Sequence, residues 1–126
     1  MEGGCHCGAI RFNTSSSSFW VGACYCVDCR KISGAPYVVY AGYKKEEVHI
    51  LKGVPKQYSS SENVWRSFCG SCGSPFSYTY KNASEKIFIY IGAFDDPSVF
   101  KLQKHIWTSQ KLPWITINDD LPQREE

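Results

Sequence analysis

The chain has 126 residues, of which 43% are hydrophobic and 15% aromatic, and its formal net charge is +2. This length fits one domain with a real core, and a near-neutral charge without a lysine or arginine cluster argues against nucleic acid as a partner. The longest apolar runs are far shorter than the roughly 20 residues that cross a bilayer, and nothing before Cys5 resembles a targeting segment, so we expect a cytoplasmic protein with no membrane partner.

Short segments rich in Tyr, Phe, Trp, Val and Ile predict strands along most of the chain. No helical pattern exceeds about two turns, and residues 26–33 are expected to form a loop or one helical turn. The sequence therefore predicts an all-β fold. In chain order, the candidate strands cover residues 8–13, 19–23, 36–43, 47–51, 57–61, 64–68, 75–80, 87–93 and 104–108.

Neither a repeat nor a linker divides the chain, so we expect one domain over residues 1–118. The remaining residues, 119–126, are acidic and polar. We expect them to form a solvated, frayed C-terminal tail, because chain ends that bury no apolar side chain are seldom held in place.

Seven cysteines dominate the chemistry of the sequence, and their number excludes a complete set of disulfides. In an extended segment, residues i and i+2 point to the same side, so a C-x-C pair aims two sulfurs at one point. Glycines follow three of the cysteines and permit tight turns. The pattern indicates metal ligands. The spacings are C-x-C at Cys5 and Cys7, C-x-C-x-x-C at Cys24, Cys26 and Cys29, and C-x-x-C at Cys69 and Cys72.

Zinc is the favoured metal, because tetrahedral thiolate sites are its commonest protein environment. Seven thiolates divide into four, which close a structural site, and three, which leave one position for water or substrate. The spacing alone does not decide the division, since residues 26 and 29 could pair with residues 69 and 72 as a zinc ribbon. An iron–sulfur cluster, a redox-active C-x-x-C without its usual βαβ context, and buried unliganded cysteines are the alternatives.

Several blocks of sequence run in the order found in one known family. They are GCHCGAIRF (residues 4–12), CYCVDCRK (24–31), SGAP (33–36), FCGSCGSP (68–75), GAFDDP (92–97), HIW (105–107) and LPW (112–114). Together they resemble the glutathione-dependent formaldehyde-activating enzyme (GFA) family over nearly the whole chain. The joint pattern is specific, whereas a single C-x-x-C would be weak evidence.

The resemblance implies an Mss4-like β-tent of stacked antiparallel sheets, with a GFA-type zinc domain over residues 1–118 and two Zn²⁺ ions at strand ends. Tyr25 stands where many members carry His, so a proton-transfer role at that position is not carried over. The resemblance also implies the division of ligands: Cys5, Cys7, Cys69 and Cys72 for the structural zinc, and Cys24, Cys26 and Cys29 for the catalytic zinc.

The activity implied by the resemblance is that of a zinc-dependent carbon–sulfur lyase acting on glutathione-type thiol adducts. The family reaction joins glutathione and formaldehyde to S-hydroxymethylglutathione, so the expected partner is a small-molecule thiol. The alternative is a non-catalytic zinc-binding interaction module of the same fold, because fold alone does not decide function. A three-thiolate site without a fourth protein ligand would favour the enzyme.

Three further residues are candidates for the chemistry of the second site. His105 could act as its general acid or base, or it could be a hydrogen-bonded packing residue beside Ile106. Arg30 and Lys31, which follow Cys29 directly, could offset the negative charge of the thiolates or bind a substrate carboxylate. They could equally be solvated surface charges.

Overall fold

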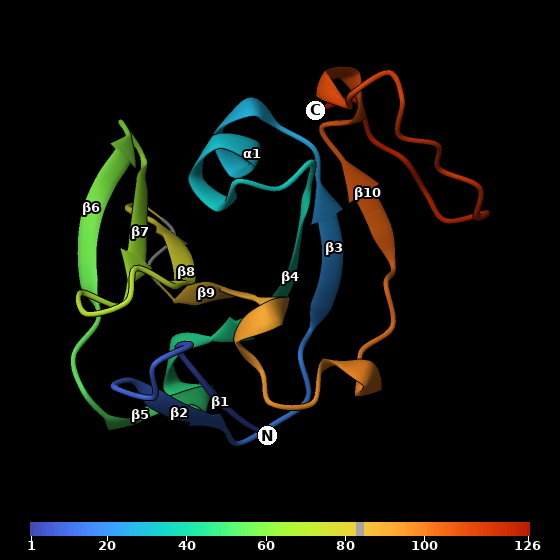
Figure 1. Ribbon diagram of the computed structural model, residues 1–126. Coiled ribbons are helices and arrows are strands. Elements are labelled where there is room, and N and C mark those ends of the chain that lie inside the picture. The colour runs from blue at the N-terminus through green and yellow to red at the C-terminus, as the bar shows by residue number, and fades with distance from the viewer. Residues whose placement is uncertain (83–84) are drawn as a thin grey trace.

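The computed structural model describes residues 1–82 and 85–126, and it contains two β-sheets and one short α-helix (Figure 1). The predicted all-β fold is confirmed. The elements are β1 (Glu2–Gly4), β2 (Arg11–Thr14), β3 (Trp20–Cys24), α1 (Val27–Ser33), β4 (Val38–Lys44), β5 (Val48–Lys52), β6 (Lys56–Ser61), β7 (Val64–Phe68), β8 (Pro75–Tyr80), β9 (Lys86–Tyr90) and β10 (Lys104–Ile106). Single turns of 3₁₀ helix are η1 (Lys45–Glu47), η2 (Ile91–Ala93), η3 (Pro97–Val99) and η4 (Thr108–Gln110).

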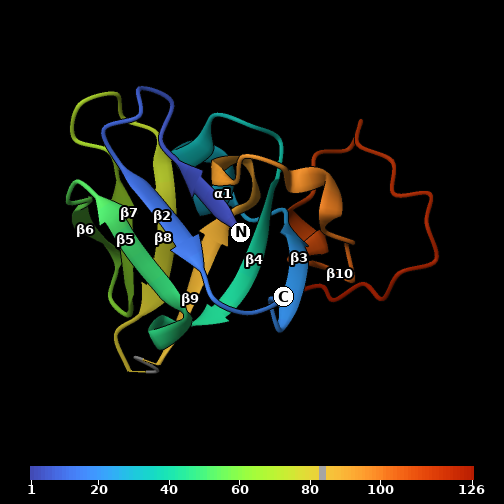
Figure 2. The same ribbon diagram turned by 90° about the horizontal axis from the view of Figure 1, so that it is seen from below.

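The two sheets differ in size. Seven strands form the larger one in the order β10-β3-β4-β9-β8-β7-β6, and three strands form the smaller one in the order β1-β2-β5. All neighbours are antiparallel except β10, which runs parallel to β3 at the edge of the larger sheet. The smaller sheet lies across one side of the larger one (Figures 1 and 2).

Alternation along the central strands divides the core between the two faces of the larger sheet. Ala41 and Ile89 contribute to a cluster that also contains Phe12 of the smaller sheet. Tyr40 and Tyr90, one residue along in each strand, contribute to a second cluster that contains cysteines of the segment around α1. One face of the larger sheet therefore packs against the smaller sheet, and the other face packs against a group of thiols.

The C-terminal segment, residues 119–126, is attached to β10, so the expectation of a frayed tail is wrong. The His105 N–H donates to the Pro122 carbonyl at 3.0 Å, and the Arg124 N–H donates to the His105 carbonyl at 2.9 Å. A parallel bridge links His105 to Gln123. These bonds use backbone groups that an edge strand otherwise exposes. The domain boundary at residue 118 stays a prediction.

Within the described part of the chain, none of the helices has the length and apolar character needed to cross a membrane.

Candidate metal centres

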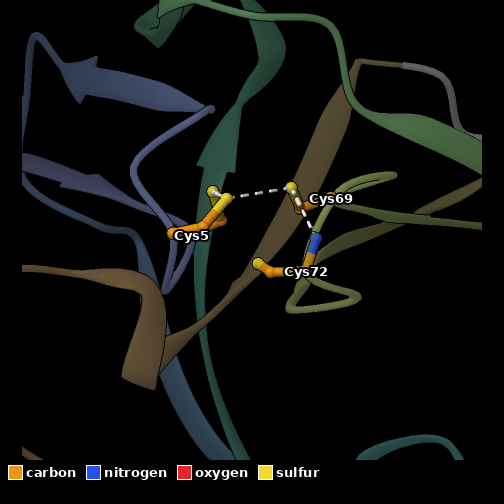
Figure 3. Close-up of side chains that lie close together, drawn as sticks. Cys5, Cys69 and Cys72 are labelled. Atoms are coloured by element: carbon orange, nitrogen blue, oxygen red, sulfur yellow. Dashed lines mark hydrogen bonds between the residues drawn. The ribbon is translucent and has the colours of Figure 1, made fainter.

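The first group of thiols joins two turns that are far apart in the sequence. Cys5 and Cys7 lie between β1 and β2, whereas Cys69 and Cys72 follow β7, and Figure 3 shows Cys5, Cys69 and Cys72 converging. The sulfurs of this four-cysteine group all lie within 4.8 Å of one another. Two of the distances between neighbouring sulfurs are 3.6 and 3.8 Å. A tetrahedron with zinc–sulfur bonds of about 2.3 Å has edges of about 3.8 Å, so the group fits zinc.

Two glycines shape the turns that carry these ligands. Gly8 follows Cys7 with φ 81°, and Gly73 follows Cys72 with φ 78°. In this left-handed region a side chain is strained, and glycine is not. The glycine after the second cysteine of each pair therefore lets the chain reverse at the metal-binding position.

Hydrogen bonds from the protein stabilise negative charge on the four-cysteine group. The Ile10 N–H donates to Cys5 Sγ at 3.2 Å, and the Cys72 N–H donates to Cys69 Sγ at 3.5 Å. Cys72 Sγ lies 3.1 Å from Ser74 Oγ, and hydrogen bonds from the Ser74 hydroxyl and N–H lower the pKa of Cys72 to about 5. Thiolate is the form that binds a metal, so this environment suits the expected role.

The second group, Cys24, Cys26 and Cys29, comes from one continuous segment, and we call it the cysteine trio. Cys24 ends β3, and Cys26 is the N-cap of α1, where its sulfur accepts a hydrogen bond from the Cys29 N–H at 3.3 Å. The three sulfurs lie within 4.8 Å of one another. Strand, cap and first helical turn therefore direct three thiols to one point, as the spacing indicates.

A fourth protein ligand is absent from the trio as far as the described residues go. Over residues 1–82 and 85–126, the trio gains no His, Asp or Glu and no further Cys as a neighbouring donor. A cavity of about 340 Å³ opens beside the three sulfurs, and its wall includes Arg66, Tyr80, Trp107 and Gln110. This volume is at the lower end of the range for small-molecule sites. The arrangement can hold a metal with three thiolates and leave one position facing the cavity.

A second cavity, of about 570 Å³, is larger but is lined by fewer groups that could bind a metal or react. It lies between the four-cysteine group and the end of α1, and its wall includes Cys5, Arg11, Tyr37 and Tyr90. Cys5 is the only cysteine that lines it, and the Arg11 guanidinium is paired with Asp95 at 2.9 Å. The smaller cavity adjoins three converging thiols, so we place the candidate reaction site there.

Arg66 is a residue of this site that the sequence analysis missed. Its side chain is only 7% exposed, and its guanidinium donates to Tyr40 Oη at 3.1 Å and to Tyr90 Oη at 2.9 Å. The same group lies 3.8 Å from Cys29 Sγ. A signal was available, because residues 64, 66 and 68 share one face of a strand whose flanking positions are apolar, and an arginine there is unusual.

Charge and hydrogen bonds converge on Cys29 from two sides. Hydrogen bonds from the Cys24 and Cys26 thiols, the Tyr40 hydroxyl at 3.1 Å and the charge of Arg66 all hold the pKa of Cys29 well below its ordinary value. The surroundings of Cys29 therefore favour the thiolate, the form of cysteine that binds a metal. Arg30 and Lys31, the cations expected beside Cys29, do not line the cavity.

His105 lies away from the cavity. Ile106, its neighbour on β10, lines the cavity, and alternation turns the His105 ring to the opposite face of the strand. Its Nδ1 lies 2.8 Å from Tyr25 Oη, and its Nε2 lies 3.0 Å from an Asp119 carboxylate oxygen. Burial raises the pKa of Tyr25 to about 12. Both ring nitrogens thus have a hydrogen-bond partner, and the acid–base role of His105 stays a prediction.

Trp107 forms part of the cavity wall with an unusual backbone conformation. Its φ of 56° and ψ of 37° lie in the left-handed region, and among the described residues it is the one non-glycine with positive φ. Such strain costs on the order of 1–3 kcal/mol and is concentrated at functional sites. The conformation ends β10 and starts η4, whose Gln110 side chain accepts a hydrogen bond from the Val27 N–H at 2.8 Å.

Comparison with known proteins agrees with these features. The family model described as glutathione-dependent formaldehyde-activating enzyme matches residues 1–110. The fold is similar to the crystal structure of a Rhodobacter sphaeroides protein, with a TM-score of 0.65 and 18% sequence identity over 81% of this chain and 97% of that chain. At this identity the structural likeness shows the fold alone. Asp119 and the rest of the C-terminal segment lie outside the matched range.

Proposed function

The chain belongs to the glutathione-dependent formaldehyde-activating enzyme family, and from this premise we propose that it is a zinc-dependent carbon–sulfur lyase. Its substrate is an adduct of a glutathione-like thiol with an aldehyde. The observation that carries the proposal is the cysteine trio, which offers three thiolates, faces a cavity and has no fourth ligand among the described residues. An open coordination position is typical of catalytic zinc sites.

The metal's contribution would be to stabilise the thiolate of the substrate thiol, whose pKa in free form is about 8.5. In the synthetic direction, the substrate sulfur forms a bond to the aldehyde carbon. The carbonyl π bond breaks, and the proton that the thiol loses is balanced by one gained at the aldehyde oxygen. The lyase direction reverses each of these changes.

Residues of the chain would prepare this reaction in two ways. The Tyr40 hydroxyl, donating to Cys29 Sγ at 3.1 Å, fixes one ligand of the trio. Trp107 and Tyr80 form aromatic walls of the cavity, which limit access of water and strengthen electrostatic interactions inside it.

The four-cysteine group takes a structural role in this proposal. With four thiolates its metal has no free position, and its ligands connect the β1–β2 turn to the turn after β7. The metal would therefore link the smaller sheet to the larger one. The complete protein would hold two zinc ions, and the seven reduced cysteines favour the cytoplasm as its location.

A non-catalytic interaction module would have no need of a three-ligand site. If the second metal served structure alone, we would expect a fourth side chain to complete its coordination. The described residues supply none within the trio, which supports the enzyme over the module.

The test is adduct formation by the zinc-loaded protein. Glutathione and formaldehyde are mixed with the protein, and the rate of S-hydroxymethylglutathione exchange is measured by NMR against the spontaneous rate. The natural protein is expected to accelerate the exchange, and Cys26→Ser is expected to leave it at the spontaneous rate. A natural protein with both metals bound and no acceleration for glutathione would contradict the proposed reaction.

A further inference from the structure

The buried guanidinium of Arg66 has no carboxylate partner in the described part of the chain. The ion pairs found there join Arg11 to Asp95 and His105 to Asp119. Arg66 instead donates to three neutral hydroxyl groups, those of Tyr40, Tyr90 and Ser60. Arginine stays protonated in proteins, and a buried charge without a counter-charge is strongly unfavourable. An anion beside the Arg66 guanidinium would therefore stabilise it.

The cysteine trio can supply this anion as thiolates, whereas the Asp28 carboxylate, which also lines the cavity, forms no ion pair with Arg66 among the described residues. The Arg66 Nη2 atom lies 3.8 Å from Cys29 Sγ, and Tyr40 connects the same two residues, accepting from Arg66 and donating to Cys29, each at 3.1 Å. Arg66 also lines the cavity beside the trio. Its charge therefore acts both on a ligand of the proposed metal and on whatever occupies the cavity.

Counting charges gives Arg66 a specific task. Three thiolates and Zn²⁺ sum to −1, and a thiolate in the fourth position would make the centre −2, whereas water or another neutral ligand would leave it at −1. The second negative charge is hard to accommodate in a buried site. With Arg66 included, the sum is 0 for a neutral fourth ligand and −1 for a thiolate. Removing the cation therefore penalises an anionic fourth ligand more than a neutral one.

We propose that Arg66 is the counter-charge of the trio and makes the site select an anionic thiolate over a neutral fourth ligand. The inference rests on the proposed function and adds a specificity-determining residue to it. Neutral donors in the same place, such as the hydroxyls of Tyr40 and Tyr90, would orient Cys29 but would not discriminate between charged and neutral ligands.

Two substitutions separate charge from shape at this position. Arg66→Lys and Arg66→Gln both remove the fork of donors to Tyr40 and Tyr90, but lysine alone keeps the positive charge. The control is Arg124→Met, which removes an exposed guanidinium from the C-terminal segment and changes the net charge as Arg66→Gln does.

The readout is ligand binding by the cobalt-loaded protein, whose absorption spectrum reports the donors around the metal. Dissociation constants are measured for glutathione, which binds as a thiolate, and for imidazole, which binds as a neutral ligand. We expect Arg66→Gln to weaken glutathione binding roughly 10- to 100-fold, the usual effect of losing a residue that supports a metal ligand. Arg66→Lys should retain most of the affinity, imidazole binding should change little in either variant, and Arg124→Met should match the natural protein.

Equal affinity of Arg66→Lys and Arg66→Gln for glutathione would overturn the inference, as would an equal loss of imidazole affinity. If Arg66→Gln alone fails to hold cobalt in the trio, charge is again the cause and the inference stands. If both variants fail to hold it, the donor fork matters instead and the inference is wrong. A natural protein that binds cobalt in the trio but never binds glutathione would contradict the proposed function itself.

Discussion

The two cysteine groups stabilise thiolates in different surroundings. In the four-cysteine group, Cys7 and Cys72 are exposed, and backbone N–H groups and Ser74 donate to the sulfurs. In the trio, Cys24 and Cys29 are buried, and a charged side chain stands beside them. Surface thiolates are stabilised by water, whereas buried ones depend on the protein.

The two groups also differ in how the fold holds their cysteines. The four-cysteine group joins two turns and offers four thiolates, which would leave a bound metal no exchangeable position. The trio is held in one segment by β3 and α1, so its geometry does not depend on a fourth ligand. We infer that the first group stabilises the fold and the second serves chemistry, and substitutions should separate these roles.

The largest effect is expected from Cys69→Ser. Cys69 is 2% exposed and is one of the four proposed ligands, so its loss should release the structural metal that we propose between the sheets. Structural zinc contributes about 10 kcal/mol or more, which is comparable to the stability of a whole domain. The variant should be largely unfolded at 25 °C by circular dichroism, with little zinc bound. A melting temperature close to that of the natural protein would show that this group is not structural.

Cys26→Ser should instead separate activity from folding. The serine hydroxyl is itself a good helix N-cap, so α1 should still begin at residue 27 as it does now. Native mass spectrometry should find one zinc rather than two, and the exchange should proceed only at the spontaneous rate. Loss of both metals, or of the fold, would mean that the two groups are not independent.

A smaller effect is expected from His105→Ala. The substitution leaves the buried Tyr25 hydroxyl without its partner at 2.8 Å, which should lower the free energy of unfolding by about 1–3 kcal/mol. The lyase rate should change less than roughly 10-fold, whereas removal of a general acid or base typically costs 100-fold or more. Urea unfolding and steady-state rates measure the two quantities. A rate loss of the larger kind at unchanged stability would instead support the predicted acid–base role of His105.

The smallest effect concerns the exposed charges beside the four-cysteine group. A hydrogen bond from Arg11, together with its charge, holds the pKa of Asp95 below its ordinary value of 3.8. Because the pKa is depressed in the folded state, the ion pair stabilises the fold above pH 3.8 and loses its effect as the pH falls through the lower, folded value. Asp95→Asn should therefore have a lower melting temperature than the natural protein at neutral pH and the same melting temperature in strong acid. Added salt should reduce the difference between the two melting temperatures at neutral pH. A difference in melting temperature that does not vary with pH would show that the ion pair is not its cause.

Local patterns predicted much of the fold, because alternation and turn residues act over short distances. The segments predicted at residues 64–68 and 75–80 have the observed bounds of β7 and β8. The segment predicted at 8–13 is observed as Arg11–Thr14, because Gly8 belongs to the turn that carries the first two ligands. The short strand Glu2–Gly4 was missed, since its glycines carry no strand signal and its pairing comes from β2.

The site was predictable where ligands are close in sequence and unpredictable where contacts are distant. The spacing of the trio indicated convergence, whereas the pairing of the first two cysteines with Cys69 and Cys72 came from the family resemblance. Arg66, 37 residues from Cys29, and Asp119, 14 residues from His105, reach their partners through strand pairing and a docked terminus. No local pattern encodes these contacts.

The most direct test of the account is X-ray absorption at the zinc edge of the natural protein, with and without glutathione. Without glutathione, the account predicts four sulfur neighbours for the metal of the four-cysteine group and three for the metal of the trio. With glutathione, it predicts four sulfur neighbours for both metals. A zinc environment that glutathione leaves unchanged, or four protein ligands at both metals from the start, would contradict it.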